Sequence, residues 1–228
     1  MLSDFIALLF PITCAACGKS LYKNEHSICT YCMYYLPKTN YHLTIDNPVA
    51  KIFWGRVPIH SAASYYSFNK GGKVQKLIHQ LKYNGQKHVG VTVGKLYGHE
   101  LKYIDDFNTI NTVIPVPLHP KRLKKRGYNQ SDSFAEGLAE SMNSDVNYKS
   151  LIRKDESNSQ TKKSRYSRWQ NVESIFDIQH PEQIAGKHLL LVDDVITTGA
   201  TLEACAQTLL QVPDIKLSIV TIAYAGGY

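Results

Sequence analysis

The 228-residue sequence lacks the long apolar stretch that a membrane-spanning helix needs. No apolar run approaches the roughly 18 residues that cross a bilayer, and the mean hydropathy is -0.26. The apolar first eleven residues are not expected to act as a secretory signal peptide, because they have no basic start, contain Asp4 and lead directly into cysteines. These absences predict a cytoplasmic protein with no membrane span.

Internal repeats beyond two cysteine pairs and low-complexity tracts are absent as well. With 43% hydrophobic and 20% charged residues, the composition is typical of a soluble globular protein and excludes disordered and fibrous classes. The length predicts one domain of ordinary size with a small appendage.

The whole chain has a formal net charge of +7, and its positive charge is concentrated in one segment. Residues 119–171 carry 12 Lys and Arg against 6 Asp and Glu, a net of +6, whereas residues 172–228 carry 2 against 7, a net of -5. A single basic run is usually a solvated surface. Basic clusters at 121–126 and 162–168, followed by an acidic segment, instead favour a site of both signs, as a metal-bound polyphosphate needs.

Cysteines are few, but four of the five form two C-x2-C pairs, Cys14 with Cys17 and Cys29 with Cys32. In a cytosolic chain this spacing favours a four-thiolate zinc site over disulfides. A redox motif or a chance pairing are the alternatives, although a redox C-x-x-C usually occurs once, near a βαβ unit. Four protein ligands would make the zinc structural. Cys205 lies on the apolar face of a predicted helix and is expected to be buried.

Apolar periodicity predicts alternating strands and helices after a joint at residues 40–58. The predicted strands are 59–68, 112–116, 147–153, 187–192 and 215–223, and the predicted helices are 74–84, 89–104, 131–142 and 200–210. This alternation predicts an α/β fold with a parallel sheet flanked by helices, whose ligands bind at the carboxyl ends of the strands. We expect a small zinc-knuckle domain over residues 1–45 and a larger domain over residues 46–228.

The most specific motif is the run Leu-Leu-Leu-Val-Asp-Asp-Val-Ile-Thr-Thr-Gly-Ala-Thr at residues 189–201. It reads as a buried strand, two acids at its carboxyl end, and a small-residue loop that opens a helix. Backbone N–H groups and hydroxyls of residues 197–201 can surround a phosphate at the helix N-terminus. The two carboxylates, Asp193 and Asp194, could accept hydrogen bonds from a vicinal diol. A Walker A loop is excluded because no lysine follows Gly199.

This run matches the phosphoribosyl pyrophosphate (PRPP) signature of type I phosphoribosyltransferases at every position. The wider chain resembles the ComF family, the competence-linked or GntX-like phosphoribosyltransferase homologues. The resemblance rests on the paired cysteines and on residues 81–83, 113–122, 126–130, 160–161 and 165–176. It implies a type I phosphoribosyltransferase fold for residues 46–228, beside the zinc-ribbon-like segment.

The resemblance also implies roles for individual residues. Asp193 and Asp194 would act at the ribose 2′ and 3′ hydroxyls, with Mg²⁺ bridging these to the diphosphate. The 5′-phosphate would be held by Thr197, Thr198, Gly199, Ala200 and Thr201. The turn at 117–122 would be the diphosphate loop, formed by Pro117, Leu118, His119, Lys121 and Arg122. Residues 155–172 would form a hood, and the diphosphate charge would be neutralised by Lys121, Arg122, Arg126, Arg165 and Arg168.

The expected function is therefore a PRPP-binding phosphoribosyltransferase-like protein linked to DNA uptake in natural transformation. It would transfer or sense a 5-phosphoribosyl group, with release of Mg-diphosphate, and DNA-uptake proteins are possible partners. No segment indicates the acceptor, and whether turnover occurs stays open. The alternative is a single-stranded DNA-binding competence factor with a regulatory or vestigial PRPP pocket. Its basis is the basic 119–171 block, where Tyr166 and Trp169 lie among bases, unless they pack inside the hood.

Overall fold

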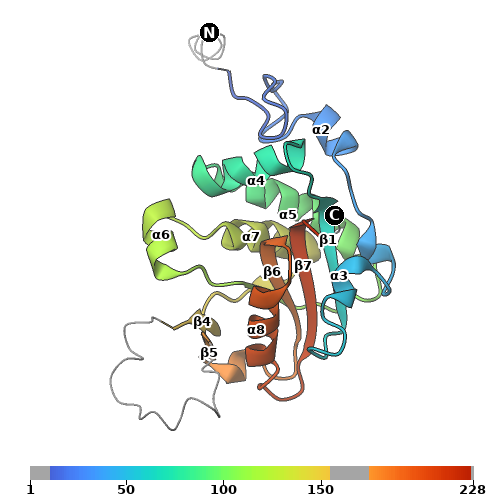
Figure 1. Ribbon diagram of the computed structural model, residues 1–228, viewed down its shortest axis with the longest axis vertical. Coiled ribbons are helices and arrows are strands. Elements are labelled where there is room, and N and C mark those ends of the chain that lie inside the picture. Colours follow the sequence, from blue (N-terminus) through green and yellow to red (C-terminus); the bar gives the residue numbers. More distant parts are fainter. Residues whose placement is uncertain (1–10, 155–174, 227–228) are drawn as a thin grey trace.

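The computed structural model describes residues 11–154 and 175–226 (Figure 1). Within these ranges, the main sheet has five parallel strands in the order β1-β7-β6-β2-β3. The strands are β1 (Ser61–Ser67), β2 (Thr112–Pro115), β3 (Asp145–Val146), β6 (His188–Ile196) and β7 (Lys216–Tyr224). The parallel α/β fold predicted from the alternation of apolar segments is therefore confirmed.

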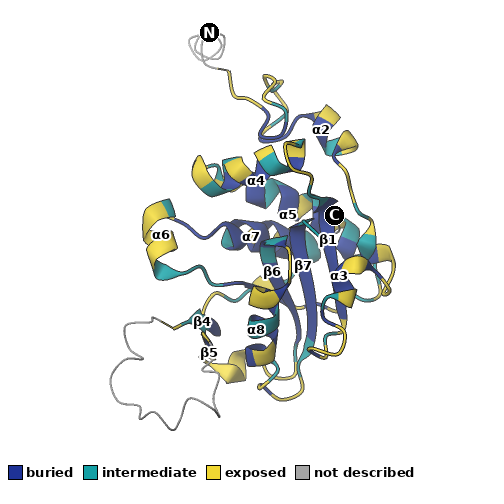
Figure 2. Ribbon diagram, viewed as in Figure 1, coloured by how far each residue is buried: buried dark blue, intermediate teal, exposed yellow. Residues whose placement is uncertain are grey.

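Helices cover both faces of the sheet (Figures 1 and 2). One face is packed by α4 (Lys73–Tyr83), α5 (Lys87–Leu101) and α7 (Gln130–Met142), and the other by α3 (Pro48–Lys51) and α8 (Ala200–Leu209). Successive side chains of β6 enter opposite cores, since Leu190 and Val192 pack with the first set of helices, and Leu189 and Leu191 pack with the second. Cys205 is buried in the second core, as predicted.

The paired cysteines form a knuckle that shares the first core. Residues 14–16, 28, 29, 32 and 36 belong to the same apolar cluster as the strand and helix residues of that face. The knuckle contains α2 (Thr30–Tyr35) and is followed by η1 (Tyr41–Leu43). Residues 37–39 run beside β1, where Ser67 donates its N–H to Pro37 and Thr39 donates its N–H to Tyr65. The knuckle is thus packed against α4 and the sheet edge.

One predicted strand is wrong. Residues 147–153 do not form a single strand, because β3 ends at Val146 and a separate strand, β4 (Leu151–Arg153), pairs antiparallel with β5 (Phe176–Ile178). The Asn147 side chain causes the break: its Oδ1 accepts the N–H groups of Lys149 at 2.9 Å and Ser150 at 2.8 Å. This local turn competes with strand pairing.

The structure also contains a helix that was not predicted, α6 (Pro120–Arg126), which follows β2. Its boundary signals were present. The His119 ring accepts the N–H of Lys121 at 3.2 Å, Pro120 occupies the first turn, and Gly127 ends the helix with a φ of 80°. The predicted joint at 40–58 likewise contains η1 and α3. A further 3-10 turn, η4 (Pro181–Gln183), precedes β6.

No helix in the described ranges combines the length and the apolarity that crossing a bilayer requires.

The contact between α5 and α7 depends on glycine. A Cβ atom at Gly137 would lie 2.1 Å from the Val91 carbonyl oxygen, and one at Gly94 would lie 2.4 Å from the Phe134 carbonyl oxygen. Both obstacles are backbone atoms, which cannot turn aside as a flexible side chain can. These glycines therefore set how closely α7 approaches α5, and so where the first residues of α7 lie.

We predict that Gly137→Ala destabilises the fold despite the better helix propensity of alanine. Separating two packed helices costs about 1–3 kcal/mol, which exceeds the gain of about 1 kcal/mol in propensity. Urea unfolding measures the difference. Glu140→Ala, on the exposed side of α7, is the control and should change the unfolding free energy by no more than about 1 kcal/mol. An unchanged midpoint for Gly137→Ala would contradict the packing argument.

Candidate functional site

The centre of the candidate site is the loop between β6 and α8. Gly199 is the N-cap of α8 with a φ of 78°, and it is buried, whereas Thr197, Thr198 and Thr201 are exposed. Glycine is required here twice over, because of the φ angle and because a Cβ atom would lie 2.5 Å from Cγ2 of Ile52. The loop therefore presents backbone N–H groups and hydroxyls at the positive end of α8, which favours an anion.

A small cavity of ≈ 70 Å³ lies over this loop. It is lined by Asp193 and residues 195–202, which include all five residues that the sequence assigned to a 5′-phosphate. The loop is also supported from behind. Arg56, which follows α3, donates to the Thr198 carbonyl at 3.3 Å and forms an ion pair with Glu203 on α8. Arg56 was not predicted from the sequence, because it lies 142 positions before Thr198 and belongs to no recognisable motif.

The two acids lie within β6 rather than after it, because the strand continues through Ile196. Asp193 is half-buried, and its Oδ1 accepts the Ser131 hydroxyl at 2.9 Å and the Asp194 N–H at 2.8 Å. Burial first and the neighbouring charge of Asp194 second raise the pKa of Asp193 from 3.8 to about 7, against the lowering effect of these hydrogen bonds. Ser131 lies in the first turn of α7, so α7 positions this carboxylate.

Asp194 points toward α4, where its Oδ2 lies 2.9 Å from Nζ of Lys82. The Asp194 side chain is buried, and that of Lys82 is mostly buried. The pair brings α4 and the central strand together at the carboxyl edge of the sheet. Lys82 belongs to the 81–83 segment that resembles the family, but no role for it was predicted from the sequence. Only the fold shows that a helix more than a hundred residues earlier supplies the counter-charge.

Lys82 also joins two larger cavities. A cavity of ≈ 390 Å³ is lined by Lys82 and Tyr83 together with Asp194 and Thr197. A second cavity, of ≈ 450 Å³, is lined by Lys82, Tyr83, Gly85, Arg122, Lys125, Arg126 and Tyr128. We call this second space the α6 cavity. The two cavities share Lys82 and Tyr83, so Asp194 on β6 and the bases of α6 lie on cavities that meet at these two side chains.

The fold brings together some of the predicted diphosphate residues. Arg122 and Arg126 line the α6 cavity, where the Arg126 guanidinium lies 5.6 Å from the Tyr83 ring centroid. Pro117, Leu118 and His119 form the half-buried turn before α6, and Lys121 is exposed on α6. The predicted hood at 155–172 lies outside the described residues. It contains the remaining predicted residues, Arg165 and Arg168, and also Tyr166 and Trp169.

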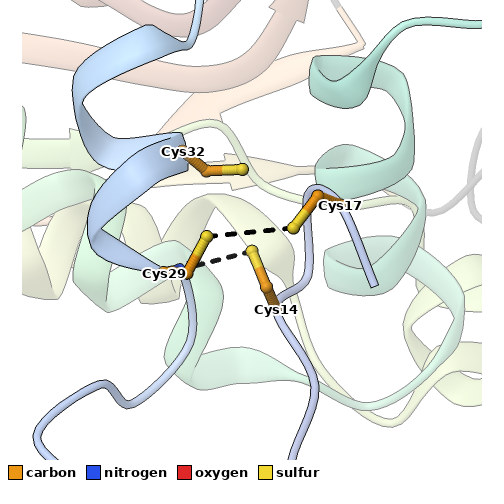
Figure 3. Close-up of side chains that lie close together, drawn as sticks. All are labelled: Cys14, Cys17, Cys29 and Cys32. Carbon is orange, nitrogen blue, oxygen red and sulfur yellow. Dashed lines mark hydrogen bonds between the residues drawn. The ribbon is translucent and has the colours of Figure 1, made fainter. Parts of the chain in front are cut away.

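The four knuckle thiols form a separate cluster. The Sγ atoms of Cys14, Cys17, Cys29 and Cys32 all lie within 4.8 Å of one another and point toward a common centre (Figure 3). The 3.8 Å between Cys17 and Cys29 equals the edge of a tetrahedron built with Zn–S distances of about 2.3 Å.

The Cys14 thiol is poised for deprotonation. Burial alone would raise the pKa of Cys14, but backbone N–H groups, led by that of Cys29, outweigh it and lower the pKa to about 7. The Cys29 N–H lies 3.3 Å from Cys14 Sγ. A sulfur that accepts N–H hydrogen bonds is stabilised as the thiolate, the form that binds metal. Burial instead raises the pKa of Cys29 and Cys32, so the fit to a closed four-thiolate metal site rests on the convergence of the four sulfurs.

Comparison with known proteins gives matches along most of the chain. Residues 130–226 match the phosphoribosyl transferase domain family. The chain is 28% identical to the DNA utilization protein YhgH of Shigella flexneri over 202 residues, which is 87% of this chain and 84% of that protein. It is 30% identical to competence protein F of Haemophilus influenzae over 58% of this chain and 60% of that protein. It is 35% identical to competence protein ComFC of Bacillus subtilis over 43% of this chain and 38% of that protein.

Among solved structures, the chain is similar to the glutamine PRPP amidotransferase of Bacillus subtilis, with a TM-score of 0.42 and 19% identity. The match covers 62% of this chain and 30% of the amidotransferase, so the chain spans less than a third of that protein. The residues that match the domain family run from α7 to the end of β7 and include β6, the loop and α8. This match to the domain family, together with the five-stranded parallel sheet flanked by helices, confirms the predicted type I phosphoribosyltransferase fold.

The raised pKa of Asp193 predicts a pH-dependent stability. Between its ordinary pKa of 3.8 and the folded value of about 7, the folded chain binds more protons at this carboxyl than the unfolded chain does. The contribution of Asp193 to the unfolding free energy therefore decreases as the pH rises from about 4 to about 7. Urea unfolding at several pH values measures the unfolding free energy as a function of pH. Between about pH 4 and about pH 7, this free energy should fall less steeply in Asp193→Asn than in the wild-type chain. The exposed Asp177 provides the control, and an equal flattening in Asp177→Asn would contradict the assignment.

The thiol cluster predicts about one zinc ion per chain, measurable by metal analysis of the purified protein. Cys29→Ser should lose the ion, because three thiolates and a hydroxyl bind zinc less tightly, and proteolysis within the knuckle should increase. Cys205→Ala keeps the four thiols and should retain the ion. A zinc content that is the same in both variants would rule out the four-thiolate site.

Proposed function

From its phosphoribosyl transferase domain and its homology with the DNA utilization protein YhgH and the competence proteins ComFC and F, we propose that this chain is a PRPP-binding, phosphoribosyltransferase-like protein of DNA uptake. The observation that carries the proposal is the loop of exposed threonines and Gly199 at the N-terminus of α8, directly after two carboxylates on the central strand. A sugar with a 5′-phosphate and vicinal hydroxyls needs both features at this spacing.

The 5′-phosphate would occupy the cavity over residues 197–201, where N–H groups and threonine hydroxyls are exposed to it. Asp193 and Asp194 would act at the ribose hydroxyls. The diphosphate would extend toward Lys82 and Arg122, whose cations border the neighbouring cavities. In this pose the negative groups of PRPP meet an N-terminal helix dipole and basic side chains, and the neutral ribose meets the acids.

Mg²⁺ would neutralise part of the diphosphate charge, with the carboxylates of β6 as the nearby oxygen ligands. The residues of this chain would then bind and orient the sugar. Substitution at C1 breaks the bond to diphosphate as the bond to an acceptor forms, so the main requirement is to position both groups and to stabilise the departing anion. Lys82 is suited to the second task, because its ammonium is already held at the edge of the α6 cavity. The zinc of the knuckle would be structural.

A second candidate function is the binding of single-stranded DNA, with the PRPP pocket regulatory or vestigial. The specific observation in its favour is α6, which carries five bases in seven residues and buries none of them. The two functions are compatible. Measuring diphosphate release from PRPP against bases, nucleosides and single-stranded DNA would separate an enzyme from a sensor.

Calorimetry with PRPP and Mg²⁺ tests the proposed function. We expect binding by the wild-type chain, and a loss of about 10- to 100-fold in affinity for Asp194→Asn and for Lys82→Met, the range expected for a hydrogen bond to a charged group. The matched control is Lys95→Met. Lys95 lies on α5 and forms an ion pair of 2.7 Å with Glu140 on α7, and it lines none of the cavities described above. The absence of PRPP binding by the wild-type chain would refute the proposal, and so would full affinity in Asp194→Asn.

A further inference from the structure

The stretch from residue 47 to residue 99 contains eight lysines and arginines and no acid. It includes α4, whose exposed residues Lys73, Lys76, His79 and Tyr83 are spaced by three, three and four positions. This spacing places them on one side of the helix. The aliphatic residues of α4, from Val74 to Leu81, face the core instead. The solvent side of α4 is therefore a line of cations and rings with no acid beside them in the sequence.

Aromatic and cationic groups extend this line at both ends. At its start, Nζ of Lys73 lies 5.0 Å from the ring centroid of Tyr31 on α2, and that ring lies 4.5 Å from the ring of Tyr35. At its end, the ring of Tyr83 lies 4.9 Å from that of His79 and 5.6 Å from the Arg126 guanidinium. We call Tyr31, Lys73, Lys76, His79 and Tyr83 the α4 ridge.

The α4 ridge connects two places that the fold keeps apart. It begins on the cysteine knuckle and ends at the α6 cavity, and the ten helical steps from Lys73 to Tyr83 rise by about 15 Å. A groove of ≈ 180 Å³ runs beside it, lined by residues 13–18 of the knuckle on one side and by Lys76, His79 and Gln80 on the other. The rings at the two ends, Tyr31 and Tyr83, are 59% and 66% exposed.

The chemistry of the α4 ridge indicates its partner. Cations with no acid in the surrounding stretch of sequence attract a polyanion, and exposed rings between them bind flat, unpaired bases by stacking. A duplex offers no free base face to such rings. A membrane surface would be met by exposed aliphatic side chains, and those of α4 are buried. An acidic peptide would use the cations but not the rings.

We propose that the α4 ridge is a binding track for single-stranded nucleic acid that leads from the cysteine knuckle to the α6 cavity. The proposal deepens the second candidate function, because it gives DNA binding a location outside the basic 119–171 block except where Arg126 meets Tyr83. It does not depend on PRPP binding. The knuckle then has a second role, since its metal-stabilised fold holds Tyr31 against Lys73.

Fluorescence anisotropy of the full chain with a labelled oligothymidine tests the proposal. Tyr83→Ala is expected to weaken binding by roughly 5- to 150-fold, the range for one stacked base. The double variant Lys73→Glu/Lys76→Glu should lower the steepness of the salt dependence by about one unit of log–log slope per lysine. A duplex of the same sequence should compete poorly, and PRPP binding by the double variant should stay at the wild-type level.

The chain offers a closely matched control at the far end of α5. Tyr103 is 69% exposed, with Nζ of Lys102 5.0 Å and the His99 ring 5.6 Å from its ring centroid. Tyr103→Ala and Lys95→Glu/Lys102→Glu remove the same kinds of group and the same charge away from the α4 ridge, and they should leave binding within about twofold. Equal losses in the ridge and control variants would overturn the proposal. So would wild-type binding in both ridge variants, equal affinity for duplex, or ridge-dependent binding only to vesicles of anionic lipid.

Discussion

Two adjacent carboxylates on the central strand are the constraint around which the fold is arranged. Neighbouring negative charges in a buried setting are costly, and each needs its own compensation. Because side chains alternate along a strand, Asp193 and Asp194 must find partners in different directions. Asp193 takes hydrogen bonds from Ser131 and the backbone, and Asp194 takes the ammonium of Lys82. The incomplete compensation of Asp193 is visible in its raised pKa.

That requirement explains why helices distant in sequence converge on one edge of the sheet. Ser131 reaches Asp193 only if α7 begins at the carboxyl end of β2. The glycine contacts between α5 and α7 set how closely these two helices approach each other. Lys82 reaches Asp194 only if α4 lies along the same edge, and the knuckle packs against α4 in a shared core. The cysteine knuckle can thus influence the acids of β6 through one helix, α4.

The features that could be predicted from the sequence are those that depend on local patterns of residues. Continuous apolar strands, the loop of residues 197–201 and the cysteine spacing each depend on neighbours within about fifteen residues, and the parallel sheet and the thiol cluster were foreseen from them. The error at 147–153 has a local cause of another kind, since a single Asn side chain outweighs apolar periodicity. Lys82 and Arg56 could not be assigned from the chain alone, because their partners lie more than a hundred residues away and only the packing of layers joins them.

The distribution of bases also has a different meaning in three dimensions. Along the sequence, the strongest concentration is at 119–171, which draws attention to α6 as the anion-binding surface. In the fold, α6 meets the end of α4, where Arg126 lies over the ring of Tyr83. The acid-free stretch around α4 contributes lysines that periodicity assigns merely to a solvated helix face. Solvated lysines alone would indicate nothing further. What distinguishes the α4 ridge is that exposed rings stand between the cations and touch them at both ends. An exposed ring gains little from water, so rings at these positions are best explained by a partner with flat faces of its own.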